Sequence, residues 1–281
     1  MSRIAYVNGV YVPHARAAVH VEDRGYQFAD GVYEVWAVRG GKLLDHEGHF
    51  DRLERSLREL RIAQPADRKG IDIIVREVAR RNRVNNGMVY LQITRGVAPR
   101  DHAFPKNVPP ALVVTAKSLD MKAIAARAEN GVRVITSPDI RWDRCDIKST
   151  ALLPNVLAKQ AAKERGGFEA WFVDEDGNVT EGSSTNAWIV DASGAIITRE
   201  LDNHILPGVT RAAIIRAAEK LRIKVIERRF TLAEAKAAKE AFLSSASGAA
   251  VPVIAIDETP IGDGKPGPIA ARLRGAYATL G

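Results

Sequence analysis

Lys148 is the side chain whose type and surroundings best suit covalent chemistry. It lies near the end of the stretch 139–149 (DIRWDRCDIKS), between an isoleucine and a serine. A strand is predicted upstream over 132–137 and a helix downstream over 151–165, so Lys148 falls on the joint between them. An amine partly removed from water loses its proton more easily and can attack a carbonyl to form a Schiff base. Most single lysines are surface residues, so this pattern alone leaves both interpretations open.

Three other places carry side chains that suit a small charged ligand. Glu181 precedes a glycine and two serines, where backbone can approach a ligand closely, and its carboxylate can keep a ring nitrogen protonated. Arg100 and His102 stand two residues apart in a loop flanked by prolines, and both can donate to a carboxylate. Arg52 lies on a predicted helix, and its guanidinium group matches a phosphate dianion. Each place also has a plainer interpretation: a turn glutamate, a surface loop and a solvated arginine.

Hydrophobic patterns predict the elements that hold these side chains in the first 120 residues. The Asn-Gly pair at 8–9 suits the positive φ angles of a type I′ hairpin turn. Tyr33 shares one face of a predicted strand with Val35 and Ala37. Residues 24–31 are predicted to form a loop. The predicted strands are 4–12 (as a hairpin), 32–38, 42–44, 89–94 and 111–115, and the predicted helices are 49–61 and 69–82.

The rest of the chain is predicted to form a second, sheet-rich domain. The first backbone N–H groups of a predicted helix over 205–221 lack partners within the helix and form an anion site, to which Thr210 adds a hydroxyl. The segment 243–248 offers more hydroxyls, and a hairpin is predicted around 262–264. Further strands are predicted at 169–173 and 186–190, with a last helix to 278. The predicted domains are 1–120 and 132–281, joined by a connection over 121–131.

Composition and charge narrow the possible partners. The 281 residues are 46% hydrophobic and 27% charged, as in an ordinary globular protein. The net charge is +7, but the basic residues are interleaved with acids and form no nucleic-acid motif, so we expect a small-molecule ligand. No apolar run is long enough to span a bilayer, no signal peptide is visible, and no histidine spacing suggests zinc. The single cysteine, Cys145, fits a cytoplasmic protein and a buried apolar position better than a nucleophile.

Several motifs together resemble those of the D-amino acid aminotransferases, fold-type IV enzymes that depend on pyridoxal 5′-phosphate. The matching segments are Arg24–Val35, His49–Leu53, Pro99–Pro105, Asp139–Trp142, Arg144–Ser149, Leu157–Gln160, Val179–Asn186 and Ile205–Arg211. The resemblance implies a two-domain α+β fold with the cofactor between the domains, and a homodimer. It also implies transamination between D-amino acids and 2-oxo acids in two half-reactions.

The resemblance further implies a role for each matched position. Lys148 is the implied catalytic residue, which carries the cofactor as a Schiff base and then moves a proton as general base and acid. In this family the loop with Arg100 and His102 reaches across from the other subunit and binds the substrate carboxylate. The implied cofactor-binding residues are Arg52, Lys148, Glu181, Leu206, Val209, Thr210, Ser245 and Ala246, and the implied substrate-binding residues are Tyr33, Arg100, His102 and Ser184.

Two positions depart from the family pattern, and several alternatives stay open. Ala246 stands where relatives often carry a hydroxyl that touches the phosphate, and Ala37 is smaller than expected, so one phosphate contact and the pocket width are undecided.

On the same fold, the alternatives are branched-chain aminotransferase, (R)-amine transaminase and aminodeoxychorismate lyase, against which the carboxylate loop argues. A cofactor-free Schiff-base lyase using Lys148 and a basic binding module without catalysis are alternatives of other classes.

Overall fold

The computed structural model describes residues 3–279, and the first of its two units is built on an antiparallel sheet. This unit comprises Met1–Asp120 with Ile147–Ala151, and the second comprises Met121–Asp146 with Leu152–Gly281. Among the described residues, the first sheet has six strands in the order β2-β1-β6-β5-β3-β4. The elements of this unit are β1 (Ile4–Val7), β2 (Val10–Pro13), the short 3-10 helix η1 (His14–Arg16), α1 (Arg24–Phe28), β3 (Gly31–Arg39), β4 (Lys42–Leu43), α2 (His46–Glu59), α3 (Arg68–Arg81), β5 (Gly87–Thr94) and β6 (Ala111–Ser118).

The predicted strands and helices of this unit are confirmed, with one correction near the start. Asn8 and Gly9 have φ angles of 44° and 100° and turn β1 into β2, as the sequence predicts. The prediction of a loop over 24–31 is wrong, because this segment contains α1. The side chain of Asp23 caps the helix by accepting from the Gly25 N–H at 2.8 Å, a signal that short helices share with turns. Ala29 then ends the helix in a left-handed conformation with φ of 55°.

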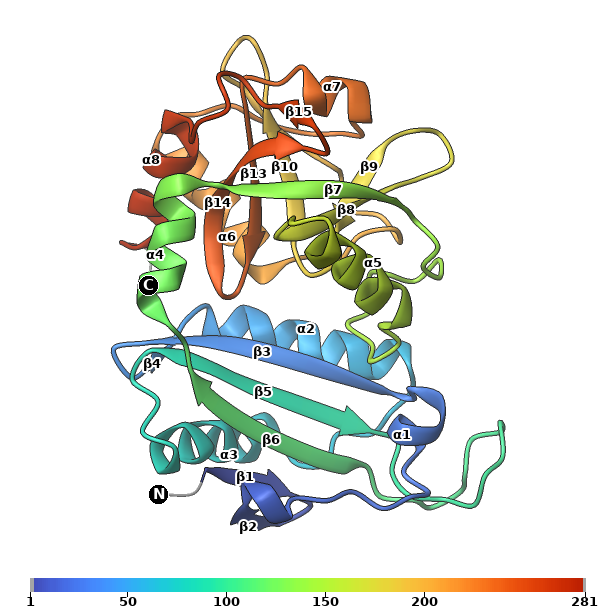
Figure 1. The fold of residues 1–281 in the computed structure, drawn as a ribbon. Helices are drawn as coiled ribbons and strands as arrows, with labels where there is room; N and C mark the ends of the chain where they lie inside the picture. Colours follow the sequence, from blue (N-terminus) through green and yellow to red (C-terminus); the bar gives the residue numbers. More distant parts are fainter. Residues whose placement is uncertain (1–2, 280–281) are drawn as a thin grey trace. The chain divides into compact units, whose positions relative to one another are not determined.

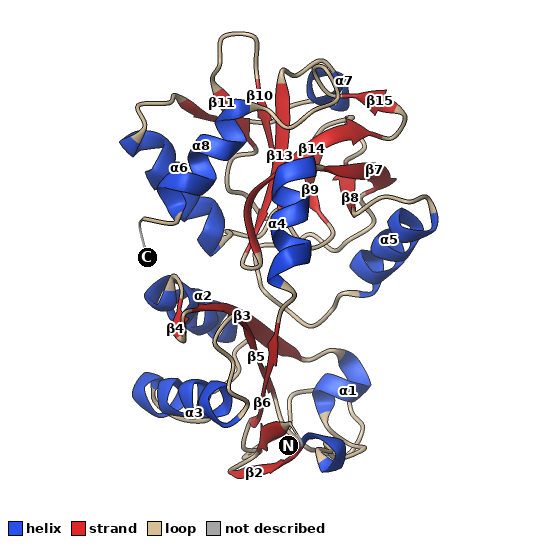
Figure 2. Cartoon of the chain, turned by 60° about the vertical axis from the view of Figure 1, so that its left-hand side comes forward, coloured by secondary structure: helices blue, strands red, loops and turns tan. Residues whose placement is uncertain are grey.

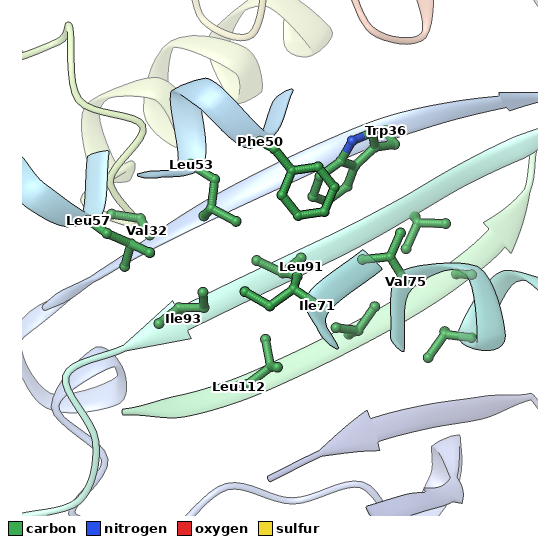
Figure 3. Close-up of a cluster of buried hydrophobic side chains, with 14 of the residues drawn as sticks. Val32, Trp36, Phe50, Leu53, Leu57, Ile71, Val75, Leu91, Ile93 and Leu112 are labelled. Carbon is green, nitrogen blue, oxygen red and sulfur yellow. The ribbon is translucent and has the colours of Figure 1, made fainter. Parts of the chain in front are cut away.

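The core of the first unit lies where α2 and α3 pack on one face of the sheet. Figure 3 shows Phe50 and Leu53 of α2 and Ile71 of α3 pointing toward Leu91 on β5. On α2 the apolar residues recur at helical spacing, which places Phe50 and Leu53 on one stripe. All four are at most 1% exposed. Trp36 of β3 belongs to the same cluster, so the face of β3 that carries it is buried.

The second unit is built on a longer, mixed sheet. Among the described residues, eight strands follow the order β12-β11-β10-β13-β14-β7-β8-β9, and the ninth, β15, pairs with β14. β7 runs parallel to both β14 and β8, whereas β10, β13 and β14 are antiparallel neighbours. The elements are α4 (Met121–Asn130), β7 (Val132–Pro138), α5 (Leu153–Glu164), β8 (Glu169–Val173), β9 (Val179–Gly182), β10 (Asn186–Val190), β11 (Ile196–Thr198), α6 (Val209–Lys220), β12 (Val225–Glu227), α7 (Leu232–Lys236), β13 (Glu240–Ser245), β14 (Gly248–Ile256), β15 (Thr259–Pro260) and α8 (Pro268–Tyr277).

Helices α6 and α8 cover part of this sheet, as Figures 1 and 2 show. Trp188 of β10 and Phe242 of β13 stack with ring centroids 5.4 Å apart, and Ile214 of α6 and Leu273 of α8 join their cluster. The mixture of helices with largely antiparallel sheets in both units confirms the predicted α+β class.

Three segments of the second unit differ from their sequence-based descriptions. The connection predicted over 121–131 forms α4. The hydroxyl-rich segment 243–248 covers the end of β13, the turn at Ala246 and Ser247, and the first residue of β14. The predicted hairpin around 262–264 is wrong in position. Its turn lies at Asp257, which has a φ of 52° and joins β14 to β15. The carboxylate of Asp257 accepts from the Thr136 N–H and hydroxyl and from Lys236. An aspartate with positive φ is a weaker sequence signal than two glycines.

None of the helices in residues 3–279 has the length and apolar character needed to cross a membrane.

Candidate active site

The backbone of Lys148 is fixed to the first unit on both sides of the lysine. Ile147 is 4% exposed and belongs to the hydrophobic core of that unit. Ser149 forms a β-bridge with Val32, and the Tyr33 N–H donates to the Lys148 carbonyl at 3.0 Å. The segment 147–150 therefore lies along the start of β3, and the position of the lysine backbone follows from the position of that strand.

The amine of Lys148 faces the ring of Tyr33. Its Nζ lies 4.2 Å from the ring centroid, and no hydrogen bond or ion pair to Nζ is found among the described residues. The Tyr33 ring also stacks on Tyr90, with centroids 5.6 Å apart. Burial, together with Tyr33, raises the pKa of the Tyr90 hydroxyl to about 12, so this phenol stays neutral and donates to Gln92 Oε1. The structure thus brings two predicted site residues, Lys148 and Tyr33, together.

Arg52 lies in a buried charge cluster that the sequence analysis does not foresee. Glu34 is fully buried on the core face of β3, and it accepts from Arg52 Nε at 2.7 Å and Nη2 at 2.9 Å. His49 Nδ1 lies 2.8 Å from the same carboxylate. Burial alone would raise the pKa of Glu34, but the charge and hydrogen bonds of Arg52, with those of His49, bring it down to about 2. Glu34 is therefore an anion that fixes the orientation of Arg52.

Arg100 and His102 lie on the same aromatic ring. The guanidinium carbon of Arg100 is 4.6 Å from the centroid of Phe28, and the His102 ring centroid is 5.3 Å from it. Both side chains are exposed. Two donors held against one ring at the tip of a loop can approach a single anion from the same side.

Glu181 is held in the second unit by three donors. It lies on strand β9, not in a turn, and its carboxylate accepts from Arg141 at 2.5 Å, Asn186 Nδ2 at 3.1 Å and the Leu206 N–H at 3.1 Å. Arg141 also donates to Asp139 at 2.7 Å, so one guanidinium group bridges the buried carboxylate of Glu181 and the half-buried one of Asp139. Such charge-assisted bonds fix the carboxylate of Glu181 in its ionised form.

The start of α6 lies next to Asn186, one of the donors to Glu181. Gly208 is the N-cap residue and supplies no side-chain cap, while Val209 and Thr210 begin the helix. A Cβ atom on Gly208 would come within 2.0 Å of Asn186 Oδ1, so the absence of a side chain lets the helix start lie close to Asn186. No hydrogen bond of the buried Thr210 hydroxyl is found among the described residues. The helix start therefore offers backbone N–H groups and a hydroxyl to an anion.

Ser245, Ala246 and Ser184 are the remaining predicted site residues of the second unit. Ser245 and Ala246 lie at the turn from β13 to β14, where the Ser245 hydroxyl is 3.2 Å from that of Ser247. Ser184 is exposed, and its hydroxyl donates to Glu169 at 2.6 Å. The Ser184 hydroxyl is therefore hydrogen-bonded to β8 of the second unit. Ser247 carries a hydroxyl one residue beyond Ala246, the position where this chain lacks the hydroxyl that relatives often carry.

Sequence reasoning missed the partners of the charged site residues. Glu34 alternates with Tyr33 on β3, and a glutamate among core positions is a visible sign of a buried ion pair. Arg141 lies within the motif that contains Lys148, but no spacing rule links it to Glu181, forty residues later. The prediction that Cys145 is a buried residue is confirmed, since it is 9% exposed. Burial raises the pKa of its thiol to about 12, which argues against a nucleophile.

Comparisons with known proteins find relatives over almost the whole chain. A family model described as amino-transferase class IV matches residues 31–256. The chain is 40% identical over 274 residues to a D-alanine aminotransferase of Staphylococcus haemolyticus, covering 97% of this chain and 95% of that protein. It is 41% identical over 268 residues to a D-alanine aminotransferase of Listeria monocytogenes serotype 4b (strain F2365), covering 95% and 92%. Its fold is similar to that of a branched-chain aminotransferase from Thermoproteus uzoniensis, solved with norvaline, with a TM-score of 0.86. The two chains are 26% identical, and the match covers 100% of this chain and 95% of that one.

Proposed function

Because the chain belongs to the amino-transferase class IV family, we propose that it transfers amino groups between D-amino acids and 2-oxo acids, of the type D-alanine and 2-oxoglutarate to pyruvate and D-glutamate. The observation that carries this choice of substrate is the pair Arg100 and His102 on the Phe28 ring. A cation and a second donor on one ring match an α-carboxylate, which an amine substrate lacks. The D-alanine aminotransferases at 40–41% identity support the same assignment.

The residues present fit pyridoxal 5′-phosphate. Lys148 offers a primary amine that faces an aromatic ring, and Glu181 offers a fixed, ionised carboxylate. The start of α6 offers backbone N–H groups and the Thr210 hydroxyl, a donor set that suits a phosphate dianion. When bound, the cofactor supplies an electron-withdrawing ring that accepts the electron pair left at the substrate Cα as its proton departs.

Lys148 is the catalytic residue of this proposal. Its Nζ would hold the cofactor covalently between turnovers. Once released, it would take the proton from the substrate Cα as general base and deliver it, as general acid, to the carbon that had been bonded to the lysine nitrogen. Because β3 holds the Lys148 carbonyl, the lysine backbone stays in place while the side chain moves. The Tyr33 ring faces this amine and stacks on Tyr90, whose phenol stays neutral because its pKa is raised to about 12.

Glu181 and the groups around α6 bind and orient the cofactor. Arg141, Asn186 and the Leu206 N–H keep the Glu181 carboxylate ionised, so it favours a protonated ring nitrogen. Val209, Thr210, Ser245 and the backbone of Ala246 are assigned to the phosphate. Arg52 is assigned there too, with Glu34 holding its guanidinium group in a fixed orientation.

The substrate carboxylate is assigned to the loop that carries Arg100 and His102, together with Tyr33. The Ser184 hydroxyl donates to Glu169 and is not available as a donor to that carboxylate. We infer that the protein is a homodimer in which each loop serves the site of the other copy. Exposed apolar side chains around the loop support a partner: Val21, Tyr26, Val97 and Phe104 are 72%, 76%, 36% and 47% exposed. An apolar patch of this kind next to polar donors is typical of an interface. Sedimentation of the purified protein tests this, with a monomer contradicting it.

The single free cysteine supports action in the cytoplasm. Cys145 is buried and forms no disulfide within the described residues, and a protein without disulfides needs no oxidising compartment. Fractionation of cells followed by an assay for D-alanine transamination would test this placement.

A second candidate function is branched-chain amino acid transamination, favoured by the fold neighbour from Thermoproteus uzoniensis. The two functions are separated by measuring kcat/KM for D-alanine and for L-leucine, each with 2-oxoglutarate. We expect D-alanine to be turned over faster, and a preference for L-leucine would replace the proposal by the second candidate. Lys148→Ala should abolish either activity, while Lys163→Ala, a lysine replacement on α5, should leave it unchanged.

A further inference from the structure

We propose that Arg24 and Asp30 are positioning residues that clamp the loop 100–105, so that Arg100 and His102 keep their places for the substrate carboxylate. This inference rests on the proposed function, which assigns the carboxylate to those two side chains. Neither Arg24 nor Asp30 is a candidate for contact with the substrate. Their effect would pass through the backbone of the loop.

Arg24 holds the loop by its carbonyl oxygens. Its side chain is 4% exposed, and its Nη1 donates to the Asp101 carbonyl at 2.6 Å and the Ala103 carbonyl at 3.3 Å. Its Nη2 donates to the His102 carbonyl at 3.3 Å. One guanidinium group therefore binds three successive residues of a loop whose side chains are exposed. A planar fork of donors is suited to this because its N–H directions are fixed.

Asp30 connects this contact to a second one. Its carboxylate accepts from Arg24 Nε at 2.8 Å and from Arg95 Nε and Nη2 at 2.8 and 2.9 Å. Arg95 in turn donates to the Leu60 and Arg61 carbonyls. The guanidinium group of Arg95 also lies 3.6 Å from the ring centroid of Phe104, at the far end of the loop. The loop is thus held at two places by two arginines that share one carboxylate.

Phe28 links the clamp to the donors themselves. Arg24 lies 4.9 Å from the Phe28 ring centroid, and Arg100 lies 4.6 Å from it. The helix α1 starts at Arg24 and ends at Phe28. It therefore provides both the arginine that binds the loop backbone and the ring that Arg100 and His102 contact. Releasing Arg24 from the loop would leave the ring in place but free the backbone that delivers the two donors to it.

Two substitutions test the clamp without removing the donors. Arg24→Met puts an unbranched apolar side chain of similar length in place of the arginine and removes its hydrogen bonds to the loop. Asp30 remains paired with Arg95, which favours folding. Arg24→Lys keeps the charge beside Asp30 but cannot reach three carbonyls with one ammonium group. Val75→Ala is the matched control, since Val75 lies fully buried on α3 in the same core and its truncation destabilises the unit without touching the loop.

The first measurement is hydrogen–deuterium exchange of the segment 99–106 in the whole protein, followed by mass spectrometry. The Ala103 N–H donates to Asp101 Oδ1 at 3.1 Å, so its exchange reports whether the loop keeps its shape. We expect exchange to be roughly tenfold faster in Arg24→Met, by loss of bonds to a charged group, and less so in Arg24→Lys. Val75→Ala should match the wild type here. Unchanged exchange in both Arg24 variants would overturn the clamp.

The second measurement is the split between KM and kcat for D-alanine. A displaced loop binds the carboxylate less well but leaves Lys148 in place, so KM should rise roughly tenfold or more in Arg24→Met while kcat changes far less. Partial recovery of KM in Arg24→Lys is expected. If exchange becomes faster but KM stays unchanged, the positioning role is wrong. The proposed function fails separately, if the wild-type protein does not turn over D-alanine at all.

Discussion

The amine of Lys148 and the ring of Tyr33 lie 4.2 Å apart, and the backbone of the same two residues is joined by a hydrogen bond of 3.0 Å. β3 therefore sets the position of both the lysine and the ring that faces it. The register of β3 is fixed in turn by its pairing with β5 from Gly31 to Val38. The candidate catalytic residue owes its position to a strand more than a hundred residues earlier in the chain.

Replacing Glu34 should change both stability and its dependence on pH. The pKa of Glu34 is about 2 in the folded protein, below its ordinary value of 4.5, so its contribution to stability is fully present above about pH 4.5 and is lost as the pH falls toward 2. Glu34→Gln leaves the Arg52 charge buried without its partner and should lower the free energy of unfolding by about 3–5 kcal/mol at pH 7. Urea titrations between pH 3 and 7 measure this, and the variant should lose less stability on acidification than the wild type.

Glu77 provides the control for that titration. Its pKa is also lowered to about 2, by Arg80 and Arg81, but it lies at the surface of α3, where solvent screens such pairs. Glu77→Gln should therefore change the free energy of unfolding far less than Glu34→Gln. Equal effects of the two substitutions would contradict a special role for the buried cluster around Arg52.

Replacing Arg100 by leucine should act on substrates that carry an α-carboxylate. Loss of a charge-assisted bond would raise KM for D-alanine and D-glutamate by roughly 10- to 150-fold, whereas 1-phenylethylamine, which lacks the carboxylate, should be affected much less. The measurement is the ratio of kcat/KM for the two kinds of substrate in wild type, Arg100→Leu and the nearby control Lys106→Leu. If Arg100→Leu lowered both by the same factor, Arg100 would be structural.

Glu181→Gln should slow the chemical step more than it weakens cofactor binding. The substitution removes the charge that favours a protonated ring nitrogen, while Arg141 keeps its bond to Asp139 and the local fold. A loss on the order of 2–3 kcal/mol corresponds to a kcat lowered by roughly 30- to 150-fold. Glu175→Gln, in the exposed turn after β8, is the control. An unchanged kcat with bound cofactor would remove Glu181 from this role.

Adding one methyl group at Gly208 should weaken the binding of the cofactor. The new Cβ would meet Asn186 Oδ1 at 2.0 Å and push away a side chain that donates to both Glu181 and the Leu206 carbonyl. We expect the Kd for pyridoxal 5′-phosphate to rise roughly tenfold or more, as measured by fluorescence titration of the protein freed of cofactor. Gly275→Ala, which meets nothing within 4 Å on α8, should bind as the wild type does. Equal affinities of the two variants would contradict the close approach at Gly208.

Most of the secondary structure could be predicted because it follows from short-range patterns. The stripe on α2 and the alternation in β5 decide those elements from their own residues. The helix α1 could not be separated from a loop in this way, since its existence depends on the cap from Asp23 and on Arg24 meeting a loop nearly eighty residues later. The turn at Asp257 was missed because an aspartate with positive φ is a weaker signal than glycine.

The chemistry of the candidate site residues could be proposed from the sequence, but the residues that position them could not. Lys148, Glu181 and Arg100 stand in motifs that the sequence displays directly. Their partners are brought to them only by the tertiary fold: Tyr33 by strand pairing, Arg141 across the sheet-rich unit, and Phe28 by the helix that the sequence analysis predicted as a loop. A single sequence contains no local pattern for contacts at such separations.

The most direct test of the central claim is to find which lysine holds the cofactor. The purified protein, loaded with pyridoxal 5′-phosphate, is treated with borohydride to make the attachment permanent, digested, and analysed by mass spectrometry. We predict that the cofactor is found on the peptide that contains Lys148, and that Lys148→Ala yields no labelled peptide and no pyruvate from D-alanine. Attachment at another lysine, or full activity of Lys148→Ala, would contradict the account.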